Sequence, residues 1–286
     1  RANAVAPTLG RTLDRSSAMR LVPRLSALAL ALGMLVAAPI AFAEAVTRPV
    51  SWTVDGTSFD GVLVFDAANN SPRPGLLMVP NWYGVTDAAV EKAKTIAGDD
   101  YVVLLVDMYG RGVRPTNPQE AGKAAGAVYA DRTQMRERIN TALATLRGID
   151  DAPLARDDVG AIGFCFGGAT VLELARSGAE LAGVASFHGA LNTTAPATAG
   201  AVKTPVLVMN GADDTFVSAA EIDAFEKEMR EAGADWQFVN YGGAVHCFAE
   251  PDEDGSVIGG CKFHEPSYRR SMEKMRDFFA ERFAAE

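Results

Sequence analysis

Short apolar runs alternate with segments of helical periodicity along most of this chain. Five runs contain mainly apolar residues and glycine, which indicates strands that are buried on both faces, as in a parallel sheet. These runs are residues 75–79, 101–106, 159–164, 181–187 and 205–210. Their alternation with helical segments predicts an α/β protein with a mostly parallel central sheet.

The segments between the runs have the spacing of amphipathic helices. Thr86 precedes the first of them and has the side chain of an N-cap. The predicted helices are residues 86–98, 118–147 (one long helix or two shorter ones), 167–177, 218–231 and 266–284, with a further strand at 235–241. Helices that flank such a sheet leave the carboxyl ends of its strands open, and ligands bind there.

An antiparallel hairpin is predicted before the first parallel strand. Residues 48–54 and 58–65 read as two strands, and the sequence Asp-Gly-Thr at 55–57 separates them as a turn. The hairpin is expected to extend one edge of the sheet.

Residues 1–43 have the features of a signal peptide with an upstream extension. Arg20 and Arg24 precede an apolar run at 25–38, and Ala-Phe-Ala at 41–43 offers small residues for cleavage. The run is short for a bilayer span, so a permanent anchor is the less favoured alternative. We expect a secreted or periplasmic protein that has no membrane segment after cleavage near Ala43.

Residues 44–286 are predicted to form a single domain. The formal charge of the chain is −9, and removal of the leader would take away five arginines and one aspartate. Such an acidic surface repels nucleic acids and anionic lipids, so neither is an expected partner. A monomer or small homo-oligomer that acts on a small molecule fits this composition.

Three potential catalytic side chains each follow a different predicted strand. Cys165 follows the strand at 159–164, Asp214 follows that at 205–210, and His246 follows that at 235–241. Because carboxyl ends of parallel strands meet at one edge, a thiol, a carboxylate and an imidazole are expected to converge. Asp213 competes with Asp214 for the role of the acid.

Glycines surround Cys165 in the sequence GFCFGGA. A sharp strand-to-helix turn needs room for its strained central residue, and Gly163 and Gly167 supply that room. Gly168 is expected to let the helix approach the sheet. The helix dipole favours the thiolate form of Cys165, which indicates a nucleophile; the alternative is an inert buried thiol.

Cys247 and Cys261 flank an acidic, glycine-rich loop. In an oxidising compartment this pair would form a disulfide and leave Cys165 free. The alternative is a metal site formed by Cys247, Cys261, His246 and His264, although no closely spaced ligand pair is present.

The three loops together resemble those of the dienelactone hydrolase family of α/β-hydrolases, over residues 45–285. GFCFGG, GADDTFV and GAVHCF match the family's catalytic loops in order and spacing. The resemblance implies an α/β-hydrolase fold without a large cap domain, and no metal or cofactor. It makes Cys165 the nucleophile, His246 the general base and Asp214 the residue that orients the imidazole. The backbone N–H groups of Trp82 and Phe166 would then form the oxyanion hole.

Two positions depart from the family's pattern. Asn81 stands where the family has a glutamate beside the thiol, and Glu250 stands where it has an arginine that binds the substrate carboxylate. Arg111 does match the family's other carboxylate-binding arginine. The resemblance therefore predicts the same reaction, with neutral esters or lactones preferred to anionic ones.

Several substrate contacts remain open on sequence alone. Trp82 and Tyr83 line the predicted pocket or fill the core, and Arg111 contacts substrate or forms a surface ion pair. His188 follows a strand end, where it either lies beside the substrate or makes a structural hydrogen bond.

The interpretation we favour is a hydrolase that cleaves a lactone, ester or thioester through an acyl-enzyme on Cys165. Thiol nucleophiles suit activated acyl groups better than amides, which disfavours a peptidase. The alternative is a protein that keeps the fold as a ligand-binding or thiol-redox module.

Overall fold

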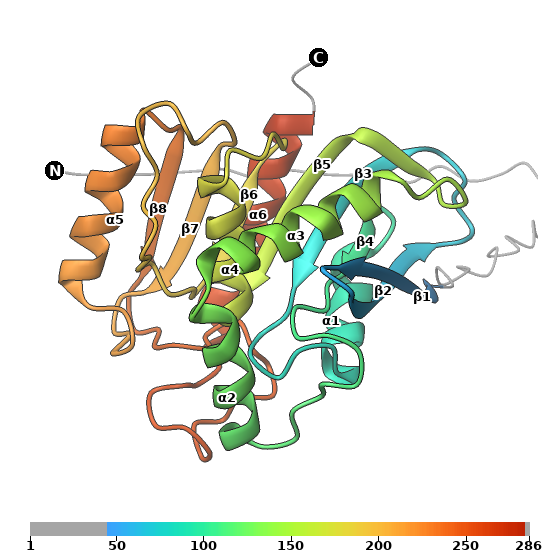
Figure 1. Cartoon of the computed structure of the whole chain (residues 1–286). Coiled ribbons are helices and arrows are strands. Elements are labelled where there is room, and N and C mark those ends of the chain that lie inside the picture. Colours follow the sequence, from blue (N-terminus) through green and yellow to red (C-terminus); the bar gives the residue numbers. More distant parts are fainter. Residues whose placement is uncertain (1–44, 284–286) are drawn as a thin grey trace, which may run out of the picture. The chain divides into compact units, whose positions relative to one another are not determined.

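Eight strands form one sheet in the computed structural model, which describes residues 45–283 (Figure 1). The spatial order of the strands is β1-β2-β4-β3-β5-β6-β7-β8. Their bounds are β1 Ala45–Val54, β2 Thr57–Asp66, β3 Arg73–Val79, β4 Val102–Leu105, β5 Leu154–Phe164, β6 Val184–Phe187, β7 Val206–Gly211 and β8 Trp236–Tyr241. The predicted signal peptide, residues 1–43, lies outside the described residues.

The predicted hairpin is confirmed and forms one edge of the sheet. β1 and β2 pair in antiparallel register from Ala45 opposite Asp66 to Val54 opposite Thr57. Asp55 and Gly56 have positive φ values of 46° and 77°, which a tight hairpin turn requires. β2 pairs antiparallel with β4, and all remaining neighbours are parallel.

The described region has six helices, of which five lie between strands and α6 follows the last strand. They are α1 Asp87–Ala97, α2 Pro118–Tyr129, α3 Arg132–Arg147, α4 Phe166–Arg176, α5 Ala219–Ala232 and α6 Glu265–Phe283. The segment predicted as one long helix or two shorter ones is two helices, because Asp131 caps α3: its side chain accepts a hydrogen bond from the backbone N–H of Gln134. Thr86 caps α1 as expected.

Two hydrophobic cores lie on opposite faces of the sheet. Side chains of α2, α3, α4 and α5 pack on one face with Leu77 and Val79, and those of α1 and α6 pack on the other with Leu76 and Met78. Figure 1 shows α3 and α4 in front of the sheet and α6 behind it. The alternation along β3 is the two-residue period of a strand buried on both faces.

Several strand boundaries differ from the prediction, and that of β5 differs most. β5 begins at Leu154 rather than at residue 159, because Arg73 and Pro74 of β3 pair with this charged first part before a register shift at Gly75. β6 begins only at Val184, because the ladder between β5 and β6 starts there and residues 181–183 lie before it. The predicted α/β-hydrolase fold is confirmed, and no large cap domain is present among residues 45–283.

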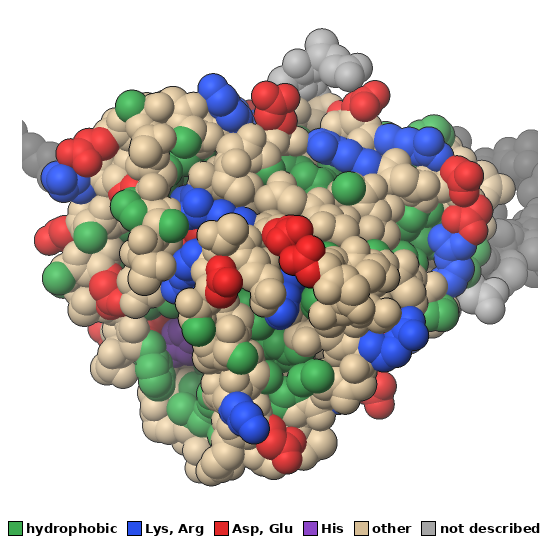
Figure 2. All heavy atoms as spheres, viewed as in Figure 1, with side chains coloured by type: hydrophobic (Ala, Val, Ile, Leu, Met, Phe, Trp, Pro, Cys, Tyr) green, Lys and Arg blue, Asp and Glu red, His purple; other side chains and the backbone are tan. Residues whose placement is uncertain are grey.

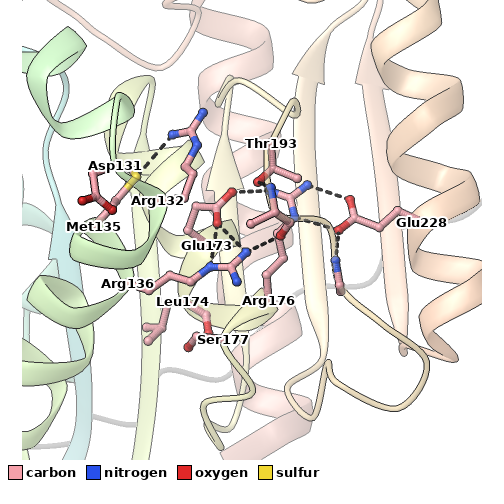
Figure 3. Close-up of polar contacts among 12 residues, drawn as sticks. Asp131, Arg132, Met135, Arg136, Glu173, Leu174, Arg176, Ser177, Thr193 and Glu228 are labelled. Atoms are coloured by element: carbon pink, nitrogen blue, oxygen red, sulfur yellow. Dashed lines mark hydrogen bonds and ion pairs between the residues drawn. The ribbon is translucent and has the colours of Figure 1, made fainter.

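A buried ion network ties the helices on one face together (Figure 3). Arg176 and Glu173 of α4 pair at 3.1 Å, and each side chain is only 1% exposed. Glu173 also pairs with Arg136 of α3 at 2.7 Å, and Arg176 pairs with Glu228 of α5 at 2.9 Å. Because each charge has an opposite partner, the network avoids the cost of an isolated buried ion.

The same network holds the connection between β6 and β7. Arg176 Nη2 donates to the carbonyl of Leu191 at 2.8 Å, and Glu228 Oε1 accepts from the backbone N–H of Ala197 at 2.7 Å. The helix that follows Cys165 is thereby linked to a long loop through charge-assisted hydrogen bonds.

The surface carries charges of both signs. Figure 2, viewed as Figure 1, shows acidic and basic side chains interspersed on the visible face, with hydrophobic side chains among them. Among the helices of residues 45–283, none has the length and hydropathy needed to cross a membrane.

Candidate active site

Cys165 lies at a strained turn between β5 and α4. Its φ is 54°, in the region that disfavours residues with a Cβ atom. The turn is tight enough that a Cβ added to Gly163 would lie 2.0 Å from the carbonyl oxygen of Gly167, and one added to Gly167 would lie 2.0 Å from that of Val79. At Gly168 the added atom would meet Ser186 Oγ at 2.7 Å. The steric roles predicted for the three glycines are confirmed.

The structure brings the thiol, the imidazole and a carboxylate together. His246 Nε2 lies 3.3 Å from Cys165 Sγ, and His246 Nδ1 lies 2.8 Å from Asp214 Oδ2. Asp214, and not Asp213, therefore contacts the imidazole. Asp214 is buried, and its other oxygen accepts a hydrogen bond from the backbone N–H of Phe216 at 2.8 Å, which orients the carboxylate.

The surroundings of His246 favour its protonated form. Burial by itself lowers the pKa of the imidazole, but the negative charge of Cys165 and the hydrogen bond to Asp214 outweigh that effect and raise the pKa to about 10. An imidazolium that faces both Cys165 and Asp214 is therefore favoured near neutral pH. Asp214 stabilises the imidazolium from its other side.

A cavity of about 210 Å³ opens onto the thiol. It is lined by Trp82, Tyr129, Cys165, Phe166, Ala190, Phe216, His246, Cys247, Ile258 and Cys261. Its walls are mainly aromatic and aliphatic, and among the described residues no Lys, Arg, Asp or Glu lines it. We call it the thiol pocket.

The two expected oxyanion donors lie at this pocket. In the described part of the chain, the backbone N–H groups of Trp82 and Phe166 donate to no protein group, so both are free for a ligand. Phe166 is the first residue of α4, where the helix dipole also favours an anion. Tyr109 Oη donates to the carbonyl oxygen of Trp82 at 2.8 Å and thereby holds this loop in place.

Sequence reasoning missed several residues of the pocket. Tyr129 comes from the end of α2, Phe216 from the loop after β7, and Ile258 from the loop before α6. Burial raises the pKa of Tyr129, and the charge of nearby Cys165 adds to the effect, so its hydroxyl stays neutral. Phe216 lies within the GADDTFV motif, two residues after Asp214, whereas no motif marks Tyr129 or Ile258, because their role depends on which segments meet at the thiol.

A disulfide joins Cys247 and Cys261 beside the catalytic histidine. Their Cα atoms are 4.9 Å apart, and Cys165 is the free thiol of the described residues, as expected. The alternative metal site is wrong, because both of its thiols are oxidised and His264 contacts Ser267 Oγ at 2.7 Å. Lys262 donates its backbone N–H to the carbonyl of His246 at 2.9 Å, so the bridged loop also supports the histidine's backbone.

Three of the expected substrate contacts line a neighbouring cavity instead. Asn81, Tyr83 and Glu250 border a space of about 280 Å³ that does not include Cys165 in its lining. Lys92 also lines this space and forms an ion pair with Glu250. The positive charge of Lys92 therefore offsets the negative charge that was predicted to repel anionic substrates. The buried, paired position of Glu250 corrects the expectation that it faces the substrate at the thiol.

Arg111 is also outside the thiol pocket. Its side chain is 59% exposed, and it donates two hydrogen bonds to Asp60, at 2.7 and 2.9 Å. These bonds from Arg111, with a further one from Ser51, lower the pKa of Asp60 to about 2. The structure therefore supports the surface ion pair and not the substrate contact.

His188 is completely buried next to the triad. Its ring centroid lies 5.1 Å from that of His246 and 5.3 Å from that of Phe248. Neither ring nitrogen has a hydrogen-bond partner among residues 45–283, which argues against the alternative of a structural hydrogen bond. Burial, with His246 and Lys92 as nearby positive charges, holds the pKa of His188 well below its usual value, so the imidazole is neutral.

Comparisons with known proteins place relatives along most of the described chain. The dienelactone hydrolase family matches residues 59–283. A putative carboxymethylenebutenolidase of Methylorubrum extorquens is 31% identical over 208 residues, covering 66% of this chain and 70% of that protein. The solved structure called m3DLH is 35% identical, with a TM-score of 0.77 over 83% of this chain and 98% of that one. A dienelactone hydrolase-like promiscuous phosphotriesterase from metagenomic libraries is 34% identical, with the same TM-score and coverage.

Proposed function

This chain belongs to the dienelactone hydrolase family, and we propose that it hydrolyses neutral, hydrophobic carboxylic esters, lactones or thioesters through an acyl-enzyme on Cys165. The observation that carries the proposal is the contact of Cys165 Sγ with His246 Nε2 at 3.3 Å in the lining of a mainly apolar pocket. A nucleophile, its proton carrier and two free backbone donors surround one space, which is the arrangement that acyl transfer needs.

The first half-reaction forms the thioester. The thiolate of Cys165 attacks the carbonyl carbon, and the electron pair of the C=O bond moves to oxygen, where the N–H groups of Trp82 and Phe166 stabilise it. When the tetrahedral intermediate collapses, the bond to the leaving oxygen or sulfur breaks. His246 donates its Nε2 proton to that leaving group and becomes neutral.

The second half-reaction releases the acid. Neutral His246 accepts a proton from water through Nε2, and the resulting hydroxide attacks the thioester carbon of the acyl-enzyme. Cys165 leaves as a thiolate, which the imidazolium again stabilises. Asp214 keeps Nδ1 as the donor to its own carboxylate throughout, so Nε2 always faces the reacting atoms.

The lining of the thiol pocket supports a neutral substrate. Trp82, Phe216 and Ile258 offer apolar surface, and no Lys or Arg among the described residues lines the pocket, while His246 is engaged by Cys165 and Asp214. An anionic lactone would lose hydration at this wall without gaining an ion pair. Neutral acyl groups of moderate size therefore fit best.

Neutral phosphotriesters are a second candidate substrate class. The 34% identity to a dienelactone hydrolase-like promiscuous phosphotriesterase supports this proposal, together with the uncharged pocket wall. The thiolate would attack phosphorus in place of carbon and expel an alkoxide or phenoxide, and the same two N–H groups would face the phosphoryl oxygen.

Secretion is also part of the proposal. The signal-like residues 1–43 and the Cys247–Cys261 disulfide support an oxidising compartment, since such bonds are rare in the cytosol. Fractionation of cells that express the full chain, followed by N-terminal sequencing, tests it; a protein that stays in the cytosol at full length contradicts it.

Trapping the acyl-enzyme tests the proposed reaction. Brief incubation with p-nitrophenyl acetate, acid quench and peptide mass spectrometry should find one acetyl group on Cys165, alongside release of p-nitrophenol. The variant Cys165→Ala should show neither. Absence of adduct and of turnover across a panel of neutral esters, lactones and thioesters would favour the binding or thiol-redox alternative.

A further inference from the structure

His188 is a buried polar side chain without a partner. The residue is 0% exposed, and both Nδ1 and Nε2 lack any hydrogen bond within the described part of the chain. Buried polar groups are nearly always satisfied, so an unsatisfied imidazole needs a physical reason. The acyl-transfer steps above leave His188 without a role.

The ring of His188 lies close to the two reactive groups of the triad. One nitrogen of His188, one nitrogen of His246 and Cys165 Sγ all lie within 4.8 Å of one another. In tetrahedral zinc sites the Zn–S distance is about 2.3 Å and the Zn–N distance about 2.0–2.1 Å, so neighbouring ligand atoms are separated by roughly 3.3–3.6 Å. His246 Nε2 and Cys165 Sγ, 3.3 Å apart, already have such a separation.

We propose that Cys165, His188 and His246 together bind one thiophilic divalent cation, with Zn²⁺ as the typical case, and that its binding switches off hydrolysis. One thiolate and two imidazoles are a donor set that zinc prefers. The effect on hydrolysis rests on the proposed function, whereas the metal site itself does not.

Binding of the cation would remove both reactive groups at once. The thiolate would donate the electron pair that otherwise attacks carbon, and His246 would release its Nε2 proton to solvent and donate the ring's lone pair. His188 would supply the lone pair of one ring nitrogen, since neither nitrogen makes a hydrogen bond within residues 45–283. The fourth ligand position would be filled by water from the thiol pocket.

Two histidine variants separate this site from unspecific zinc binding. His188→Leu removes the third donor, and His264→Gln removes the remaining histidine of the chain, which contacts Ser267 and lies outside the cluster. Zn²⁺ affinity is measured by competition with a chromophoric chelator. We expect one tight site in the wild type, a loss of at least tenfold in His188→Leu, and no change in His264→Gln. Equal affinity in wild type and His188→Leu would overturn the proposal.

X-ray absorption spectroscopy of the zinc-loaded wild type gives a second readout that needs no variant. One sulfur and two imidazole nitrogens in the first coordination sphere are expected. A shell with one imidazole, or without sulfur, would contradict the site even if His188→Leu failed to fold.

An activity measurement distinguishes failure of this inference from failure of the proposed function. Zn²⁺ should inhibit p-nitrophenyl acetate hydrolysis by the wild type, and a chelator should restore it. If the protein binds zinc at this site but hydrolyses no ester, lactone or thioester, the metal site is supported and the proposed function is wrong. If the protein hydrolyses the ester but binds no zinc, only the metal-site inference is wrong.

Discussion

His246 Nε2 lies 3.3 Å from Cys165 Sγ, close enough for a thiolate and an imidazolium to stabilise each other. The pair is partly buried, so solvent screens this attraction less than at an open surface. Its most direct consequence concerns the titration of the histidine.

His246 should remain protonated well above neutral pH. Its pKa is raised from 6.5 to about 10 against the effect of burial, chiefly by Cys165 and then by Asp214. The imidazolium therefore adds to the free energy of unfolding fully below pH 6.5, and this contribution is lost as the pH rises through about 10. ¹⁵N NMR of the imidazole should show this titration, and Cys165→Ala should move it to lower pH. Equal titration in both proteins would show that the thiol is not its cause.

Removal of either reactive group should abolish ester hydrolysis. Cys165→Ala and His246→Ala are expected to lose nearly all of kcat/KM for p-nitrophenyl acetate while both variants remain folded by circular dichroism. Asp214→Asn should lose at least tenfold, because the imidazole loses its anionic partner. The matched control Asp213→Asn changes the neighbouring aspartate, which does not contact His246, and should keep wild-type activity. An equal loss in both asparagine variants would assign the effect to the loop rather than to the contact.

The exposed position of Arg111 predicts that it does not select substrates. Arg111→Ala should leave the ratio of kcat/KM for a neutral ester to that for a carboxylate-bearing ester unchanged, since the guanidinium is held by Asp60 outside the thiol pocket. Phe216→Lys, which adds a cation to the pocket wall, should raise kcat/KM for the anionic ester relative to the neutral one. A marked loss of anionic substrate turnover in Arg111→Ala would place this side chain at the substrate after all.

The buried network around Glu173 should contribute strongly to stability. Glu173→Ala leaves Arg176 with one of its two carboxylate partners and Arg136 with none, and we expect a loss of about 3–5 kcal/mol in the free energy of unfolding. Glu231→Ala is the matched control, because Glu231 pairs with Lys227 on the exposed face of α5 and should cost less than about 1 kcal/mol. Urea unfolding followed by circular dichroism measures both, and similar costs would mean that burial of the pair has little effect.

The sequence by itself determined the sheet and the turn that carries the nucleophile. Strands buried on both faces must be apolar along their whole length, so β3, β4 and β7 are visible as continuous runs. A turn with a backbone approach as close as that between Gly163 and Gly167 excludes any Cβ atom, and only glycine meets that demand. Both constraints act on residues that are close together in the sequence, so both can be recognised from the sequence alone.

Only the tertiary structure decided which side chains meet. Asp213 and Asp214 are chemically identical neighbours, and the choice between them depends on which carboxylate the end of β7 directs toward His246. Glu250 and Lys92 are 158 positions apart, so their pairing leaves no local pattern. The proximity of His188 to Cys165 and its lack of hydrogen-bond partners in the described core could not be predicted from the sequence either. Both properties arise from packing between segments that are distant in sequence.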